Sequence, residues 1–152
     1  MASYKLTYFN GRGRVETART LFKLAGVAFE DHRIEMKDWP EYKPKTPFGS
    51  LPVLDIDGRI IVQSKAIFRY LARGFGFYGE SNWDCAQIDS IVDMLDEFYY
   101  PKMFVILTGS GEEKEKAVAE FTETATKVLG DLEKILSEND GGDGYFVGKR
   151  YN

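Results

Sequence analysis

Residues 51–62 read Leu-Pro-Val-Leu-Asp-Ile-Asp-Gly-Arg-Ile-Ile-Val, which places a short β-forming run on each side of Asp57-Gly58. A two-residue Asp-Gly spacer favours a tight turn between antiparallel strands, so this stretch predicts a β-hairpin. Ser64 follows the hairpin, and apolar residues at helical spacing then continue to Gly76. The stretch and its downstream neighbour therefore predict two antiparallel strands and a helix that Ser64 can cap.

The chain before the hairpin predicts a strand, a helix and a second strand. Residues 4–9 are rich in β-forming aromatics, two glycines interrupt the run, and an apolar pattern of helical spacing covers residues 18–25. Residues 29–34 predict the second strand, reached by a crossover, and residues 36–45 predict a polar connection with a short helix. The order βαβ and then ββα predicts an α/β domain over residues 1–76.

The second half of the chain has a different hydrophobic pattern, with two long segments of helical periodicity and no strand-like alternation. Apolar residues keep a three-and-four spacing over residues 88–99 and again over 117–136, with glycines between the two segments. Pro101 predicts a kink in the first helix, and a breaker cluster predicts that the second ends near Glu138. We expect a linker at 77–83 and an all-helical domain over 84–152.

Composition excludes several classes of protein. No window approaches the roughly 18 apolar residues of a membrane span, and a net charge of −4 argues against a nucleic-acid partner. A single cysteine, Cys85, excludes an internal disulfide and fits a reducing compartment, so we expect a cytoplasmic protein. His32 is equally alone, and without a second histidine or cysteine both residues favour structural roles over metal binding or a Cys/His dyad.

Five strings carry a resemblance to a known family. They are, in chain order, Tyr4-Lys5-Leu6-Thr7-Tyr8-Phe9 with Arg12-Gly13-Arg14; Glu30-Asp31-His32-Arg33; Asp38-Trp39-Pro40; Pro47-Phe48-Gly49-Ser50-Leu51-Pro52-Val53-Leu54; and Gln63-Ser64-Lys65-Ala66-Ile67. Together they resemble the sigma class of cytosolic glutathione transferases, a group related to glutathione-dependent prostaglandin D synthase. The resemblance implies a thioredoxin-like first domain with a mixed four-stranded sheet. Family members continue through further helices, so we expect Asn152 to be a truncation point.

The chemistry that this family performs requires a glutathione thiolate. A free thiol with a pKa of about 8.5 is mostly protonated at neutral pH. Lowering that pKa by about two units requires about 2.7 kcal/mol of preference for the thiolate, which one charge-assisted hydrogen bond and a nearby cation can supply. The resemblance assigns the hydrogen bond to Tyr8 and the cation to Arg14. On pattern alone, Tyr8 is one aromatic residue in an aromatic strand.

The resemblance also implies how glutathione is bound. The main chain of Leu51, next to a cis Pro52, pairs with the cysteinyl part, although the sequence alone allows an ordinary strand-starting proline. Gln63 and Ser64 meet the γ-glutamyl carboxylate at the start of a helix, where Ser64 could also be a plain cap. The other contacts implied are Ser50 beside Leu51, and Trp39 and Lys43 at the glycyl carboxylate.

An acidic cluster, Asp93, Asp96 and Glu97, lies on the polar side of the first long helix. Such a face is usually only solvated. The resemblance implies a homodimer in which Asp96 reaches the ligand amino group bound by the other subunit. Prostaglandin-isomerising members hold a divalent ion with acidic residues here, but Glu97 replaces the expected aspartate, so no metal is predicted.

The leading hypothesis is a transferase that conjugates glutathione, its co-substrate, to small apolar electrophiles in detoxification. The faces that residues occupy on the expected helices predict an electrophile pocket. It would be lined by Phe9, Arg14, Met94, Tyr99, Phe104 and Leu107. One alternative is a glutathione-dependent prostaglandin isomerase, although that branch favours a pocket tryptophan and none follows Trp83. Another is a non-catalytic scaffold that binds haem or other apolar ligands, or a structural protein.

Overall fold

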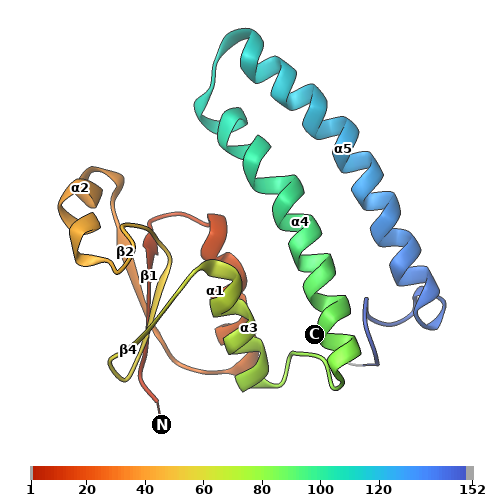
Figure 1. The fold of residues 1–152 in the computed structure, drawn as a ribbon, viewed down its shortest axis with the longest axis horizontal. Coiled ribbons are helices and arrows are strands. Elements are labelled where there is room, and N and C mark those ends of the chain that lie inside the picture. Colours follow the sequence, from red (N-terminus) through yellow and green to blue (C-terminus); the bar gives the residue numbers. More distant parts are fainter. Residues whose placement is uncertain (1, 150–152) are drawn as a thin grey trace. The chain divides into compact units, whose positions relative to one another are not determined.

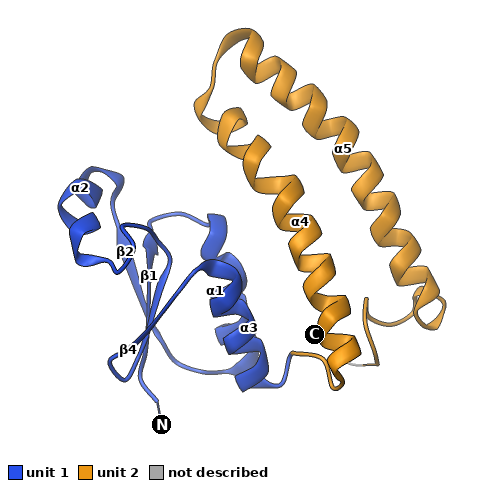
Figure 2. Ribbon diagram, viewed as in Figure 1, with its two compact units in different colours: residues 1–77 blue, residues 78–152 orange. Residues whose placement is uncertain are grey.

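The computed structural model describes residues 2–149 (Figure 1). The chain divides into two compact units, Met1–Phe77 and Tyr78–Asn152 (Figure 2). The first contains the sheet and three of the helices, and the second is helical.

A mixed four-stranded sheet organises the first unit. The strands are β1 (Tyr4–Phe9), β2 (Glu30–Ile34), β3 (Val53–Ile56) and β4 (Arg59–Val62), in the order β2-β1-β3-β4. β1 runs parallel to β2 and antiparallel to β3, and β3 and β4 form the predicted hairpin around Asp57-Gly58. β3 begins two residues later than the start of the apolar run, because Pro52 has no N–H to donate to the ladder.

The helices of the first unit are α1 (Glu16–Ala25), the short α2 (Trp39–Tyr42) and α3 (Ser64–Phe75). α1 and α3 pack together against the sheet (Figure 1). Short 3₁₀ turns cover Gly13–Val15, Met36–Asp38 and Lys43–Lys45. The core is a single cluster of buried residues drawn from β1, β3, α1, α3 and the turn before α1: Leu6, Val15, Ala18, Phe22, Leu54, Ile56, Ile67 and Leu71. This arrangement confirms the predicted thioredoxin-like βαβ-ββα domain.

The second unit is built on two long helices, α4 (Asn82–Thr108) and α5 (Gly111–Glu138), followed by a 3₁₀ turn, Asp140–Gly142. Ser81 and Asp84 form a capping box at the start of α4, with both reciprocal hydrogen bonds at 3.0 Å. α4 continues through Pro101, and α5 ends where the breaker cluster predicted. Along the pair, the ring of Phe98 stacks on that of Phe121 with centroids 4.8 Å apart.

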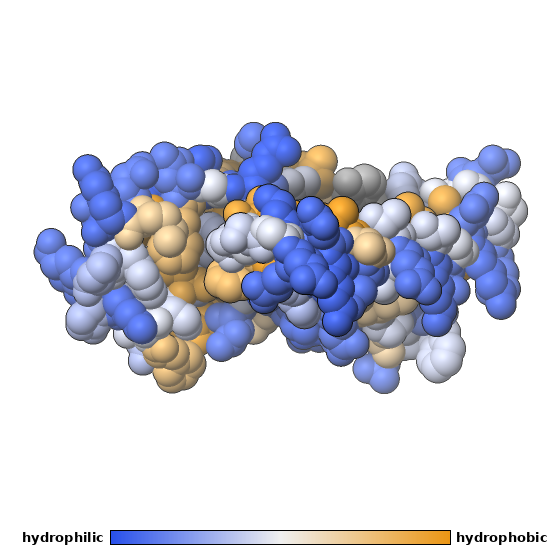
Figure 3. All heavy atoms as spheres, turned by 90° about the horizontal axis from the view of Figure 1, so that it is seen from above, coloured by the Kyte–Doolittle hydropathy of each residue, from blue (hydrophilic) through white to orange (hydrophobic). Residues whose placement is uncertain are grey.

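Polar residues cover much of the face shown in Figure 3, with apolar residues between them. Within residues 2–149, none of the helices is both long and apolar enough to cross a membrane.

Candidate functional site

Tyr8 lies near the end of β1, and the loop after the strand turns back over its hydroxyl. The main-chain N–H of Arg14 donates to Tyr8 Oη at 3.3 Å. A Cβ added to Gly13, whose φ is +55°, would lie 3.0 Å from the same oxygen. Both the positive φ and the close approach therefore require glycine at this position. A tyrosine hydroxyl has a single proton, and because Oη accepts the Arg14 bond that proton can be donated to another acceptor.

The close approach of Gly13 to Tyr8 is a feature of this site that sequence reasoning missed. The glycines indicated that the strand ends before the helix, and Arg12-Gly13-Arg14 contributed to the family resemblance, but neither observation predicted a contact with Tyr8. The identity of the group that a glycine faces depends on tertiary structure, and no local signal in this stretch points to Tyr8.

Leu51 and Pro52 connect α2 to β3. Their peptide bond is cis, as the resemblance implies. Within the described residues, neither the N–H nor the C=O of Leu51 makes a hydrogen bond. A backbone donor and acceptor on one residue can pair with one residue of an extended peptide.

Lys43 and Trp39, from the polar connection, contact two other parts of the first unit. A Cβ at Gly49, where φ is +61°, would lie 3.3 Å from Lys43 Cε, so the lysine stem passes directly over this loop next to Ser50. The ring of Trp39 meets that of Phe9 edge to face, with centroids 5.3 Å apart. The structure thus brings the polar connection to the end of β1, beside Tyr8.

The start of α3 differs from the sequence prediction. Ser64 was expected to cap the helix, but it is already the first helical residue, and the N-cap position belongs to Gln63. Gln63 has φ +72° and no side-chain capping bond, although its carbonyl accepts from Ile67 N–H at 3.0 Å. A left-handed φ at a residue other than glycine is strained and often marks a functional site. The uncapped N–H groups of α3, together with the Ser64 hydroxyl, form a suitable environment for a carboxylate.

All but one of the predicted glutathione contacts lie in the first unit. The exception, Asp96, is on α4 together with the predicted pocket residues Met94, Tyr99, Phe104 and Leu107. At about 100° per residue, Phe104 and Leu107 share a face of α4, whereas Met94 and Tyr99 point about 140° apart. These four side chains therefore do not form one wall.

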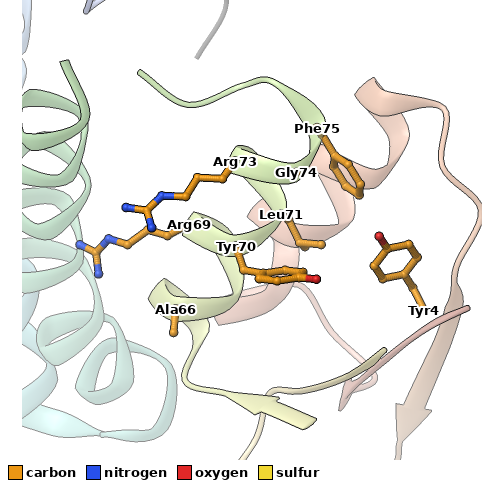
Figure 4. Close-up of a pocket in the computed structure, with 8 residues that line it drawn as sticks. All are labelled: Tyr4, Ala66, Arg69, Tyr70, Leu71, Arg73, Gly74 and Phe75. Atoms are coloured by element: carbon orange, nitrogen blue, oxygen red, sulfur yellow. The ribbon is translucent and has the colours of Figure 1, made fainter. Parts of the chain in front are cut away.

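A separate pocket of about 630 Å³ opens beside α3 (Figure 4). Figure 4 shows the lining residues, among which Tyr4 and Tyr70 lie on one side of α3 and the side chains of Arg69 and Arg73 extend from its other side. None of the residues lining it is a predicted glutathione contact. Among the described residues, no group of three or more His, Cys, Asp or Glu side chains is placed to hold a metal ion.

Comparison with known proteins places this arrangement in a family. The N-terminal domain of glutathione S-transferases matches residues 4–73. Over 153 residues the chain is 48% identical to glutathione S-transferase 1 of Ascaris suum, in an alignment that covers 98% of this chain and 73% of that protein. The chain belongs to the glutathione transferase family.

Two further relatives refine this placement. The transferase chain is 47% identical to hematopoietic prostaglandin D synthase of Gallus gallus, covering 98% of this chain and 72% of that protein. It is 45% identical to S-crystallin SL11 of Nototodarus sloanii, covering 97% of this chain and 73% of that protein. The predicted resemblance to sigma-class transferases related to prostaglandin D synthase is confirmed, and the chain spans about 73% of the length of such relatives.

Proposed function

We propose that this glutathione transferase conjugates the glutathione thiolate to small apolar electrophiles, with Tyr8 as the residue that stabilises the thiolate. The observation that supports this most directly is the geometry at Tyr8 Oη. The hydroxyl accepts from Arg14 N–H at 3.3 Å and is approached by Gly13, so its proton can be directed away from the loop.

The proposed reaction needs no metal. The thiol of bound glutathione loses its proton to solvent, and the thiolate accepts a hydrogen bond from the Tyr8 hydroxyl. The sulfur then attacks the electrophilic carbon, forming a thioether while the leaving group departs with the bonding electron pair. The Arg14 main-chain N–H polarises the tyrosine hydroxyl, which makes that hydroxyl a stronger donor to sulfur.

The remaining proposed glutathione contacts are those that the family resemblance implies. The Leu51 main chain pairs with the cysteinyl residue, and Ser64 with the start of α3 receives the γ-glutamyl carboxylate. Trp39 and Lys43 receive the glycyl carboxylate. In the proposed homodimer, Asp96 contacts the ligand amino group bound by the other subunit. Phe9 and Arg14 supply contacts to the electrophile from the first unit.

Glutathione-dependent isomerisation of a prostaglandin endoperoxide is a second candidate, favoured by the 47% identity to a prostaglandin D synthase. It would use the same thiolate. The absence of tryptophan after Trp83 weighs against it. Product analysis with the endoperoxide as substrate distinguishes the two activities, because conjugation yields a thioether and isomerisation returns free glutathione.

The experiment that tests the proposal compares wild type with Tyr8→Phe. We expect kcat/KM with a general aromatic electrophile to fall about 10²-fold, as for the loss of one preorganised donor. Calorimetry at a pH below the pKa of the bound thiol, where glutathione binds protonated to both proteins, should show an unchanged Kd for glutathione. Tyr4→Phe is the matched control, since Tyr4 is on the same strand and its ring packs on Phe22. Equal rates for wild type and Tyr8→Phe would remove Tyr8 from the mechanism. Glutathione binding without turnover in wild type would favour a non-catalytic scaffold.

A further inference from the structure

The string Glu30-Asp31-His32-Arg33 has no part in the proposed contacts with glutathione. In the structure, two of its side chains belong to a network that ends at the loop over Tyr8. We propose that Arg19, at the centre of this network, is a positioning residue that holds residues 10–14 in place so that Tyr8 can stabilise the thiolate. This inference rests on the proposed function.

Arg19 lies on α1 and is 4% exposed. Its Nη1 donates to the main-chain carbonyl of Gly11 at 2.5 Å and to Glu16 Oε2 at 3.2 Å, and its Nε donates to Asp31 Oδ1 at 3.1 Å. A buried guanidinium requires anionic and carbonyl partners to offset its desolvation. Because its fork is rigid, Arg19 fixes the position of the Gly11 carbonyl relative to both carboxylates.

The same network holds Asn10, the residue before Gly11. Asp31 Oδ2 accepts from Arg33 Nε and Nη2 at 2.9 and 2.7 Å, and Arg33 Nη1 donates to Asn10 Oδ1 at 3.2 Å. Asn10 Nδ2 donates to Glu35 Oε1 at 2.8 Å, and its main-chain N–H donates to the carbonyl of Ile34 at 3.0 Å. The start of the loop is therefore tied to β2 and to the residue after that strand.

The end of the loop meets Tyr8 through a long main-chain hydrogen bond. The bond from Arg14 N–H to Tyr8 Oη is 3.3 Å long, beyond the usual range for N–H···O bonds. Gly13, immediately before it, has φ +55° and the backbone freedom of glycine. A shift of Gly11 can therefore pass through the loop and lengthen or break the bond. Arg19 is the buried side chain that opposes such a shift from the α1 side.

The variants Arg19→Gln and Arg19→Lys test this role. The readout is the ultraviolet absorbance of the thiolate of bound glutathione, followed against pH. We expect the apparent pKa of the bound thiol to rise by about one unit, so that kcat/KM below that pKa falls about tenfold and the deficit closes at alkaline pH. At a pH below the pKa of the bound thiol, the Kd for glutathione should change little, because Leu51 and Ser64 are not part of the network. Arg19→Lys should recover part of the effect, since one ammonium can still reach the Gly11 carbonyl.

Leu71→Ala is the matched control for lost stability, because Leu71 is 1% exposed in the same core but makes no contact in this network. A purely structural role for Arg19 predicts that both Arg19 variants lower Tm as Leu71→Ala does and leave the thiol pKa unchanged. That result would overturn the inference.

Two further measurements keep the test decisive. If both Arg19 variants fail to fold, Asp31→Asn retains the guanidinium and the side-chain volume, and it should also raise the thiol pKa, but by less; no change would refute the role.

If wild type itself fails to ionise glutathione, the proposed function is wrong. Amide exchange at Arg14 without glutathione still tests Arg19: faster exchange in Arg19→Lys supports positioning, and unchanged exchange contradicts it.

Discussion

The two units bury their side chains very differently. Leu6, Phe22 and Leu54 in the first unit are completely buried, whereas none of the residues of α4 is buried. Phe104 and Leu107 on that helix are 70% and 74% exposed. Tyr8 and the loop over it therefore lie in a unit whose core fixes their positions. Four of the six residues predicted to line the electrophile pocket lie on α4, a helix that has no comparable core.

The largest expected difference between the units is in the unfolding free energy lost when a leucine of each unit is replaced by alanine. Leu71→Ala in α3 removes a side chain that is 1% exposed and should cost about 2–5 kcal/mol of unfolding free energy. Leu129→Ala in α5 removes one that is 64% exposed and should cost less than about 0.5 kcal/mol. Urea denaturation followed by circular dichroism measures both. Similar losses for the two variants would refute the contrast in burial.

Two glycines in the loop after β1 provide a sharper contrast within the first unit. Gly13→Ala places a Cβ 3.0 Å from Tyr8 Oη at a φ of +55°, which should cost about 1–3 kcal/mol and reduce turnover. Gly11→Ala meets nothing within 4 Å and should leave turnover close to wild type. Steady-state kinetics with saturating glutathione provides the comparison. An active Gly13→Ala enzyme would mean that the close approach at Tyr8 is not required.

A third prediction asks whether the hydrogen bonds that cap α4 stabilise the second unit. Ser81→Ala removes the cap of α4 and should cost about 1 kcal/mol. Ser110→Ala at the start of α5 is the control, because its side chain makes no capping bond. Thermal unfolding of the two variants gives the difference. A Tm for Ser81→Ala equal to that of the control would show that the capping box does not stabilise the folded chain.

The smallest expected effects are those of pH, and they should separate the units. Hydrogen bonds from Ser81 lower the pKa of Asp84 from 3.8, and the bond and charge of Lys102 lower that of Glu120 from 4.5. Each ionised carboxylate therefore stabilises the folded chain at pH values above these unperturbed pKa values, and this stabilisation is lost as pH falls below them. Glu30 raises the pKa of Lys5 above 10.5. The stabilisation of the folded chain by the charged lysine is therefore lost only as pH rises through the raised pKa. As pH is lowered, amide exchange should become faster in α4 and α5 before it does in β1. The reverse order would contradict this assignment.

Local signals predicted most of the fold because they act over a few residues. Asp57-Gly58 located the hairpin, and Gly76 marked the end of α3. The roles of Ser64, Gly13 and Arg19 depend on what the folded chain places beside them. Gln63 occupies the cap position with a strained φ, and Arg19 meets a carbonyl eight residues earlier and a carboxylate twelve residues later. Periodicity and turn propensity contain no information about such pairings.

The most direct test of the central claim is the titration of the glutathione thiol bound to wild type and to Tyr8→Phe, followed by thiolate absorbance. We predict that the thiol bound to wild type has an apparent pKa about two units below the value of about 8.5 for a free thiol, and that Tyr8→Phe returns it toward that value. A bound thiol that titrates like the free one in wild type, or identical titrations for both proteins, would contradict the role of Tyr8.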